Sequence, residues 1–120
     1  MQMHILVVDD NAGVRAVIGE LLTEAGYRVT LAQGGSEMRS VLSDDPSVDA
    51  IILDLFLTDE AGESLALYAE TLKVSTILIT GGSTGREFAR AHHIQLLRKP
   101  FKSDQLFAAV ARAVDPRAST

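Results

Sequence analysis

The sequence contains no cysteine, which excludes disulfide bonds and metal sites built from thiolates. It also contains no apolar run near the ~20 residues that a membrane-spanning helix needs. Acidic residues outnumber basic ones, and the net charge of -5 argues against direct binding to nucleic acid or to an anionic membrane. The first apolar run, at residues 5–8, leaves no room for a signal peptide, so we expect a cytoplasmic protein.

The remaining composition is that of an ordinary globular protein. Its 120 residues suffice for one domain, and 47% of them are hydrophobic, as a single buried core requires. No repeat, low-complexity segment or linker divides the chain. We therefore predict one domain over residues 1–120, with a core at about 4–114 and a short polar tail at 115–120.

Short apolar runs alternate along the chain with segments of helical periodicity. The predicted strands cover residues 5–8, 28–32, 50–54, 76–80 and 94–98. The predicted helices cover about residues 14–25, 34–43, 64–72, 85–91 and 103–114. This alternation predicts an α/β fold, a doubly wound parallel sheet with helices on both faces. Of two plausible stackings, the flavodoxin-like (βα)5 order 2-1-3-4-5 suits a chain of this length, with the half-polar second strand at an edge.

Local signals indicate where some helices begin and which faces they bury. Asn11 is a suitable N-cap for the first helix, and Thr84 and Glu87 have the spacing of a capping box at the fourth. Leu72 is expected on the inner face of the third helix. Small residues on the last helix give it a surface that would allow a homodimer, although alanine is also simply a good helix former. These residues are Ala108, Ala109, Ala111 and Ala113.

Polar side chains stand where four of the five predicted strands end. Asp54 closes the most apolar strand, and Asp9 and Asp10 follow the first one. Thr80 ends the fourth strand, and Lys99 follows the fifth. Because the carboxyl ends of parallel strands meet at one edge of a sheet, we expect these side chains to share a pocket. Each residue alone also fits a purely structural role, such as a turn or a helix cap.

Three carboxylates in one pocket repel one another and have raised pKa values unless a cation joins them. Oxygen ligands without cysteine suit Mg²⁺, which commonly binds one or two carboxylates, waters and phosphate oxygens. A lysine and a threonine hydroxyl opposite the ion would complete a site for a phosphoryl group. A carboxylate can itself be the nucleophile and form an aspartyl phosphate. We predict Asp54 as this nucleophile, because it is the aspartate least committed to holding metal.

The ordered set of these motifs resembles that of the receiver domains of response regulators, the phosphoproteins of two-component signalling and phosphorelays. The motifs are, in chain order, Asp9-Asp10, Asp54, Thr80-Gly81 and Lys99-Pro100. The resemblance extends over residues 5–114, and its strength lies in the order and spacing of the four motifs. It implies that Asp54 accepts a phosphoryl group from a phosphohistidine on a sensor histidine kinase or a histidine phosphotransfer protein.

The resemblance also implies a role for the other site residues. Asp10 and Asp54 would ligate Mg²⁺ directly, together with the backbone carbonyl of Phe56, and Asp9 would act directly or through water. Lys99 would pair first with the acceptor carboxylate and then with the phosphoryl group.

Thr80 would turn inward to a phosphoryl oxygen, and the amide of Gly81 would donate beside it. The Lys99–Pro100 bond would be cis. The move of Thr80 would switch the face formed by the fourth helix, fifth strand and fifth helix, which would bind a downstream protein partner.

The sequence departs from the family pattern at Thr58, where a proline is common, and at Leu96. Leu96, three residues before the lysine, stands where receivers usually carry an aromatic ring that turns inward on activation. Switching in this protein would therefore proceed without a ring.

Other functions fit the sequence less well. A flavodoxin-like cofactor site would place Asp9 and Asp10 against a phosphate, which they would repel. A stand-alone hydrolase of the haloacid dehalogenase type needs a second aspartate at the position of Phe56, so we expect no independent enzyme. The alternative that stays open is a receiver-like interaction module that is not phosphorylated.

Overall fold

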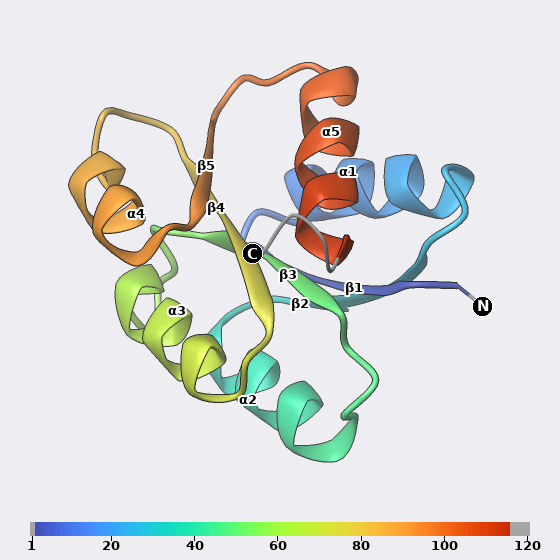
Figure 1. The fold of residues 1–120 in the computed structure, drawn as a ribbon, viewed down its shortest axis with the longest axis horizontal. Coiled ribbons are helices and arrows are strands. Elements are labelled where there is room, and N and C mark those ends of the chain that lie inside the picture. The colour runs from blue at the N-terminus through green and yellow to red at the C-terminus, as the bar shows by residue number, and fades with distance from the viewer. Residues whose placement is uncertain (1, 116–120) are drawn as a thin grey trace.

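The computed structural model describes residues 2–115, and five strands alternate in it with five helices (Figure 1). The strands are β1 (His4–Val8), β2 (Arg28–Ala32), β3 (Ala50–Asp54), β4 (Ser75–Thr80) and β5 (Gln95–Arg98). The helices are α1 (Ala12–Glu24), α2 (Gly35–Asp44), α3 (Gly62–Thr71), α4 (Arg86–His92) and α5 (Ser103–Val114). The last five residues of the predicted tail, 116–120, lie outside the described residues.

All five strands are parallel and lie in the order β2-β1-β3-β4-β5, which confirms the predicted flavodoxin-like topology. The register aligns the carboxyl ends of the inner strands: Val8 pairs with Leu53, and Asp54 pairs with Ile79. The half-polar strand β2 lies at one edge of the sheet, as predicted. The topology thus brings the ends of β1, β3, β4 and β5 together at one rim.

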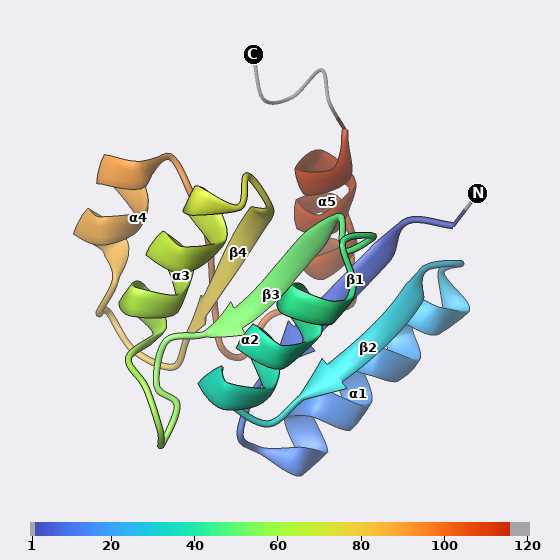
Figure 2. The same ribbon diagram turned by 90° about the horizontal axis from the view of Figure 1, so that it is seen from below.

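Helices cover both faces of the sheet, with α1 and α5 on one side and α2, α3 and α4 on the other (Figures 1 and 2). Successive residues of a strand point to opposite faces. Accordingly, Ile5 and Val7 belong to the core beneath α1 and α5, whereas Leu6 and Val8 belong to the core beneath α2, α3 and α4. Because both faces are covered, β1 and β3 are buried throughout, as their continuous apolar runs predict.

The start of α1 agrees with its sequence signal, since the side chain of Asn11 accepts a hydrogen bond from the amide of Val14 at 3.0 Å. The predicted capping box at α4 is wrong. The N-cap is Gly85, whose φ of 95° lies in the left-handed region, and it makes no side-chain cap bond. The chain therefore enters α4 through a glycine turn that Thr84 does not cap.

Two predictions about which side chains lie on the buried or the exposed face of a helix are also wrong. Leu72 is 45% exposed, because α3 ends at Thr71 and Ala66 and Ala69 occupy the inner face instead. Ala109 belongs to the core beneath α5, so the four alanines of that helix do not form one exposed surface. Among the described residues, no helix is long and apolar enough to cross a membrane.

Candidate functional site

The strand ends bring the predicted acidic residues together. Asp9 follows β1 directly, Asp54 is the last residue of β3, and Asp10 lies beside Asp9. Each of the three offers a carboxylate oxygen, and these oxygens all lie within 4.8 Å of one another. Asp9 and Asp54 are buried, whereas Asp10 is exposed to solvent. The site is therefore a partly open acidic pocket at the carboxyl rim of the sheet.

Lys99 neutralises part of this charge from the end of β5. Its Nζ lies 3.1 Å from Oδ2 of Asp9 and 3.4 Å from Oδ2 of Asp54. The backbone amide of Lys99 donates to the carbonyl oxygen of Thr80 at 2.7 Å, which holds the lysine beside β4. The Lys99–Pro100 peptide bond is cis.

Asp9 is held by a network that the sequence reasoning did not identify. Its Oδ1 accepts a hydrogen bond from the amide of Asn11 at 2.9 Å, which closes a turn after β1. Its carbonyl oxygen accepts from Nη1 of Arg15 at 2.8 Å, one turn into α1. The Asp-x-Asn sequence was the available signal for the turn, because aspartate side chains commonly bond the amide two residues on. These bonds fix the direction of the buried carboxylate.

Asp54 has a similar turn but a different electrostatic environment. Its Oδ1 accepts from the amide of Phe56 at 3.0 Å. Burial raises the pKa of the Asp54 carboxyl; the Phe56 hydrogen bond works in the opposite direction, and the charge of Asp9 adds to the rise. Burial alone would lower the pKa of Lys99, but its hydrogen bond to Asp9 and the nearby charge of Asp54 raise it overall. The pocket thus disfavours an ionised Asp54 and favours a charged lysine.

Thr80 and Gly81 lie at the adjacent end of β4. Thr80 is buried, and its Oγ1 accepts a hydrogen bond from the amide of Gly82 at 3.2 Å. Among the described contacts, this hydroxyl has no bond to Asp54 or Lys99. Leu96 of β5 pairs with Leu78 of β4 and packs, half-buried, against the core beneath α2, α3 and α4.

The residues present fit a divalent cation. Three carboxylates face one ammonium group, which leaves two negative charges uncompensated when all the groups are ionised. All the available side-chain ligands are oxygens, as a hard ion such as Mg²⁺ prefers. The amide of Phe56 bonds the Asp54 carboxylate, so the Phe56 backbone belongs to the same rim, and the residue is exposed to solvent.

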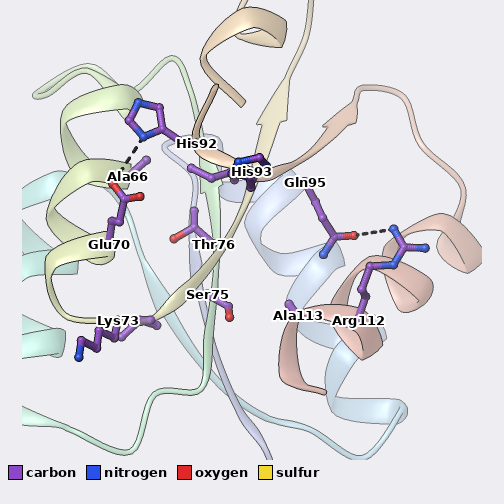
Figure 3. Close-up of a pocket in the computed structure, with 12 residues that line it drawn as sticks. Ala66, Glu70, Lys73, Ser75, Thr76, His92, His93, Gln95, Arg112 and Ala113 are labelled. Atoms are coloured by element: carbon purple, nitrogen blue, oxygen red, sulfur yellow. Dashed lines mark hydrogen bonds and ion pairs between the residues drawn. The ribbon is translucent and has the colours of Figure 1, made fainter. Parts of the chain in front are cut away.

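A separate groove of about 310 Å³ lies at the opposite rim, among the amino ends of β4 and β5 and the ends of α3, α4 and α5 (Figure 3). In it, Nδ1 of His92 lies 3.5 Å from Oε2 of Glu70, and the His92 ring packs on Phe88 with the centroids 4.4 Å apart. The adjacent residues His92 and His93 differ in exposure: His93 is exposed, whereas His92 is half-buried. Neither contributes to the acidic pocket.

The fold and the acidic rim define the class of α/β signalling domains that carry a phosphoacceptor aspartate. The family model "Response regulator receiver domain" matches residues 5–111, and the chain belongs to this family.

Curated relatives are longer regulators. The transcriptional regulatory protein GlrR of Escherichia coli K12 is 34% identical over 122 residues, which cover 96% of this chain and 27% of that protein. This chain therefore spans about a quarter of the length of such a relative.

Solved receiver structures share the fold over nearly their whole length. The response regulator receiver protein of Sinorhizobium medicae WSM419 is 24% identical, with a TM-score of 0.86 over 97% of both chains. The BeF3-activated receiver domain of DrrB is 26% identical, with a TM-score of 0.79 over 95% of this chain and 98% of that one. The chain is thus a receiver domain of the kind found in the response regulators of two-component signalling.

Proposed function

We propose that Asp54 is the phosphoacceptor of this receiver and takes its phosphoryl group from a phosphohistidine on a sensor histidine kinase or a phosphotransfer protein. The observation that carries the proposal is the convergence of Asp9, Asp10, Asp54 and Lys99 on one point of the rim. Such convergence matches what phosphoryl transfer requires, because its transition state spreads negative charge over oxygens that need positioned positive charge.

Asp9, Asp10, Asp54 and the backbone carbonyl of Phe56 would hold Mg²⁺. A bound Mg²⁺ ion supplies positive charge next to the oxygens of the transferred group. The other positive charge comes from the protein itself, since Lys99 already lies 3.4 Å from the Asp54 carboxylate.

In the transfer step, a carboxylate oxygen of Asp54 attacks phosphorus, the new O–P bond forms and the N–P bond to the donor imidazole breaks. The leaving imidazole nitrogen takes a proton from solvent. The Phe56 amide and Lys99 orient the attacking carboxylate, one at each oxygen. The product is an aspartyl phosphate that carries about one more negative charge than the carboxylate did, together with new acceptor oxygens.

The new negative charge would change the hydrogen bonding of the Thr80 hydroxyl. This hydroxyl, now bonded to Gly82, would turn to a phosphoryl oxygen, and the amide of Gly81 would donate beside it. Leu96 lies on the neighbouring strand and packs against the same core as α4. We propose that this aliphatic side chain repacks in place of an aromatic ring and so alters the face made by α4, β5 and α5. This face would bind the downstream protein partner.

The test is intact-mass measurement after incubation with acetyl phosphate and Mg²⁺. We expect the wild type and Asp44→Asn to gain one phosphoryl group, and Asp54→Asn to gain none. Asp44 is a matched control because it is an exposed aspartate at the end of α2. Equal labelling of Asp54→Asn would remove Asp54 as the acceptor. A folded wild type that binds Mg²⁺ but accepts no phosphoryl group from acetyl phosphate or from a phosphohistidine donor would favour the alternative, an interaction module that is not phosphorylated.

A further inference from the structure

The loop after the phosphoacceptor caps a helix that lies elsewhere in the chain. The N-cap of α2 is Gly34, which has no side chain to satisfy the first amides of the helix. Asp59, 24 residues after Gly35, does this instead. Its Oδ1 accepts from the amide of Gly35 at 3.0 Å, and its Oδ2 accepts from the amide of Ser36 at 3.1 Å. Figure 2 shows the loop after β3 beside the start of α2.

The next residue of the loop, Glu60, attaches it to α2 at a second point. Glu60 accepts from Nε of Arg39 at 3.2 Å and also from Nη2 of the same guanidinium group. The guanidinium carbon lies 4.5 Å from the centre of the Tyr68 ring, so Arg39 is held between the loop and α3. Two successive acidic residues therefore attach the loop to α2 by four hydrogen bonds.

Two glycines at the start of α2 make this attachment possible. A Cβ on Gly34 would lie 2.7 Å from Oδ1 of Asp59, and a Cβ on Gly35 would lie 3.0 Å from Oε1 of Glu60. The φ of Gly34 is -170°, which any residue can adopt, so its backbone does not require glycine. A Cβ at this position would instead push the Asp59 carboxylate away from the helix amides.

The same loop is fixed at its other side to the acceptor. The Phe56 amide bonds the Asp54 carboxylate, Phe56 pairs with Ala61 in a short antiparallel bridge, and the Gly62 amide donates to Leu55 O at 3.1 Å. Phe56, whose carbonyl is proposed to face the metal, thus lies between the acceptor and the Asp59 anchor.

From these contacts we propose that Asp59 is a positioning residue for the phosphoacceptor site and that the Arg39–Glu60 pair supports it. The carboxylate holds residues 55–61 in the shape that presents the Phe56 carbonyl, so divalent-ion binding at Asp54 is coupled to the first turn of α2. This inference rests on the proposed function, because it assigns Asp59 a role toward the same metal site. Groups that orient metal ligands from one layer further out affect metal affinity strongly.

The test compares Mg²⁺ affinity and backbone amide spectra in five proteins: the wild type, Asp59→Ala, Asp59→Asn, Gly34→Ala and the control Asp44→Ala. We expect Asp59→Ala to weaken Mg²⁺ binding by up to about 10-fold, the low end of such effects, since Asp59 acts on the ligands only through the loop backbone. The Mg²⁺ affinity of Asp59→Asn should lie between those of the wild type and Asp59→Ala, because one acceptor oxygen remains after the charge is lost. Gly34→Ala should resemble Asp59→Ala, because it displaces the carboxylate without changing the loop sequence. Asp44→Ala, which removes an exposed carboxylate from the other end of α2, should bind Mg²⁺ as the wild type does.

A second readout separates positioning from a general loss of stability. In the wild type, Mg²⁺ should shift the amide signals of Gly35 and Ser36, and Asp59→Ala should abolish these shifts while the protein stays folded. If Asp59→Ala and Gly34→Ala bind Mg²⁺ like the wild type, the coupling is overturned and the phosphoacceptor proposal stands. If Asp59→Asn and Asp59→Ala weaken Mg²⁺ binding equally, the charge of Asp59 rather than its positioning of the loop is responsible, and the proposed coupling is again overturned. A wild type that binds no Mg²⁺ overturns both proposals.

Discussion

The Nζ of Lys99 lies 3.1 Å from Oδ2 of Asp9, although 90 residues separate the two in the chain. Asp9 has no exposed surface, and Lys99 retains 27% exposure, so the pair joins a buried carboxylate to the rim of the pocket. The same ammonium group also reaches Asp54 at 3.4 Å. Among the residues that the structure describes, Lys99 is thus the cation that pairs with both buried carboxylates.

Replacing Lys99 with glutamine should destabilise the protein in the absence of divalent ions. Two buried carboxylates would lose their counter-charge, and leaving such a group without its partner costs about 1–3 kcal/mol. Mg²⁺ should then raise the melting temperature of Lys99→Gln more than that of the wild type, because it replaces the missing positive charge. Thermal unfolding in EDTA and in Mg²⁺ measures both effects. Lys73→Gln, at an exposed lysine, should stay within about 0.5 kcal/mol of the wild type. An equal loss in the two variants would contradict this role of Lys99.

Gly62 and Gly82 should respond differently to alanine. A Cβ on Gly62 would lie 2.5 Å from Cα of Leu55 and 2.9 Å from the carbonyl oxygen of Asp54, and backbone atoms cannot move aside cheaply. We expect Gly62→Ala to cost roughly 1–3 kcal/mol or more, as overpacked sites do. Gly82 has no atom within 4 Å of such a Cβ, so Gly82→Ala should change the free energy of unfolding by less than about 1 kcal/mol. Urea unfolding of both variants measures these changes in the free energy of unfolding. Similar losses of stability in the two variants would show that the close approach of Gly62 to Leu55 is unimportant.

The sheet and the acidic pocket could be predicted because both depend on patterns that are local in the sequence. Continuous apolar runs identify the buried strands, and a polar residue at the end of each parallel strand falls at one rim whatever the loops do. Strand order alone then brings Asp9 near Asp54. The sequence could not distinguish buried Asp9 from exposed Asp10, because the turn after β1 decides which of them points inward.

The attachment of the acceptor loop to α2 could not be predicted for a different reason. Asp59 and Gly35 are 24 residues apart, belong to no repeating pattern, and meet only once β2 and β3 have been placed on either side of β1. The sequence showed two glycines opening a helix, but it gave no sign that an acidic side chain needed their space. The wrong prediction for Leu72 has a similar cause. Periodicity places Leu72 on the inner face of α3 but does not show at which residue the helix ends.

Asp54→Asn should raise the stability of the metal-free protein at neutral pH. The folded-state pKa of Asp54 lies above its ordinary value of 3.8, chiefly because of burial, so the folded protein takes up this proton first as the pH falls. The stability contributed by the protonated form is present below 3.8 and is lost as the pH rises through the folded-state pKa. At pH 7 the wild type thus carries an unfavourable buried charge that the amide lacks. Melting temperatures in EDTA should favour Asp54→Asn at pH 7, and the gap should narrow toward pH 4. A gap that is constant with pH would rule out ionisation as its cause.

His4, at the opposite rim from the acidic pocket, should make stability fall on mild acidification. Its ring is buried, with Nε2 2.7 Å from the Thr30 hydroxyl and Nδ1 3.1 Å from that of Ser47. Burial and the nearby charge of Arg28 lower the pKa of His4 below its ordinary value of 6.5, although Asp45 and Asp49 act in the opposite direction.

As the pH falls through 6.5, the unfolded chain therefore binds this proton before the folded protein does, and the free energy of unfolding decreases. We expect the wild type to lose more stability between pH 7.5 and pH 5.5 than His4→Gln, which cannot titrate there. His93→Asn is the matched control, because His93 is exposed and asparagine tolerates its positive φ of 56°. Urea unfolding across this pH range should give His93→Asn the slope of the wild type and His4→Gln a shallower one. An unchanged slope in His4→Gln would mean that the buried ring keeps an ordinary pKa, because its hydroxyl partners and the two aspartates would then offset its burial completely.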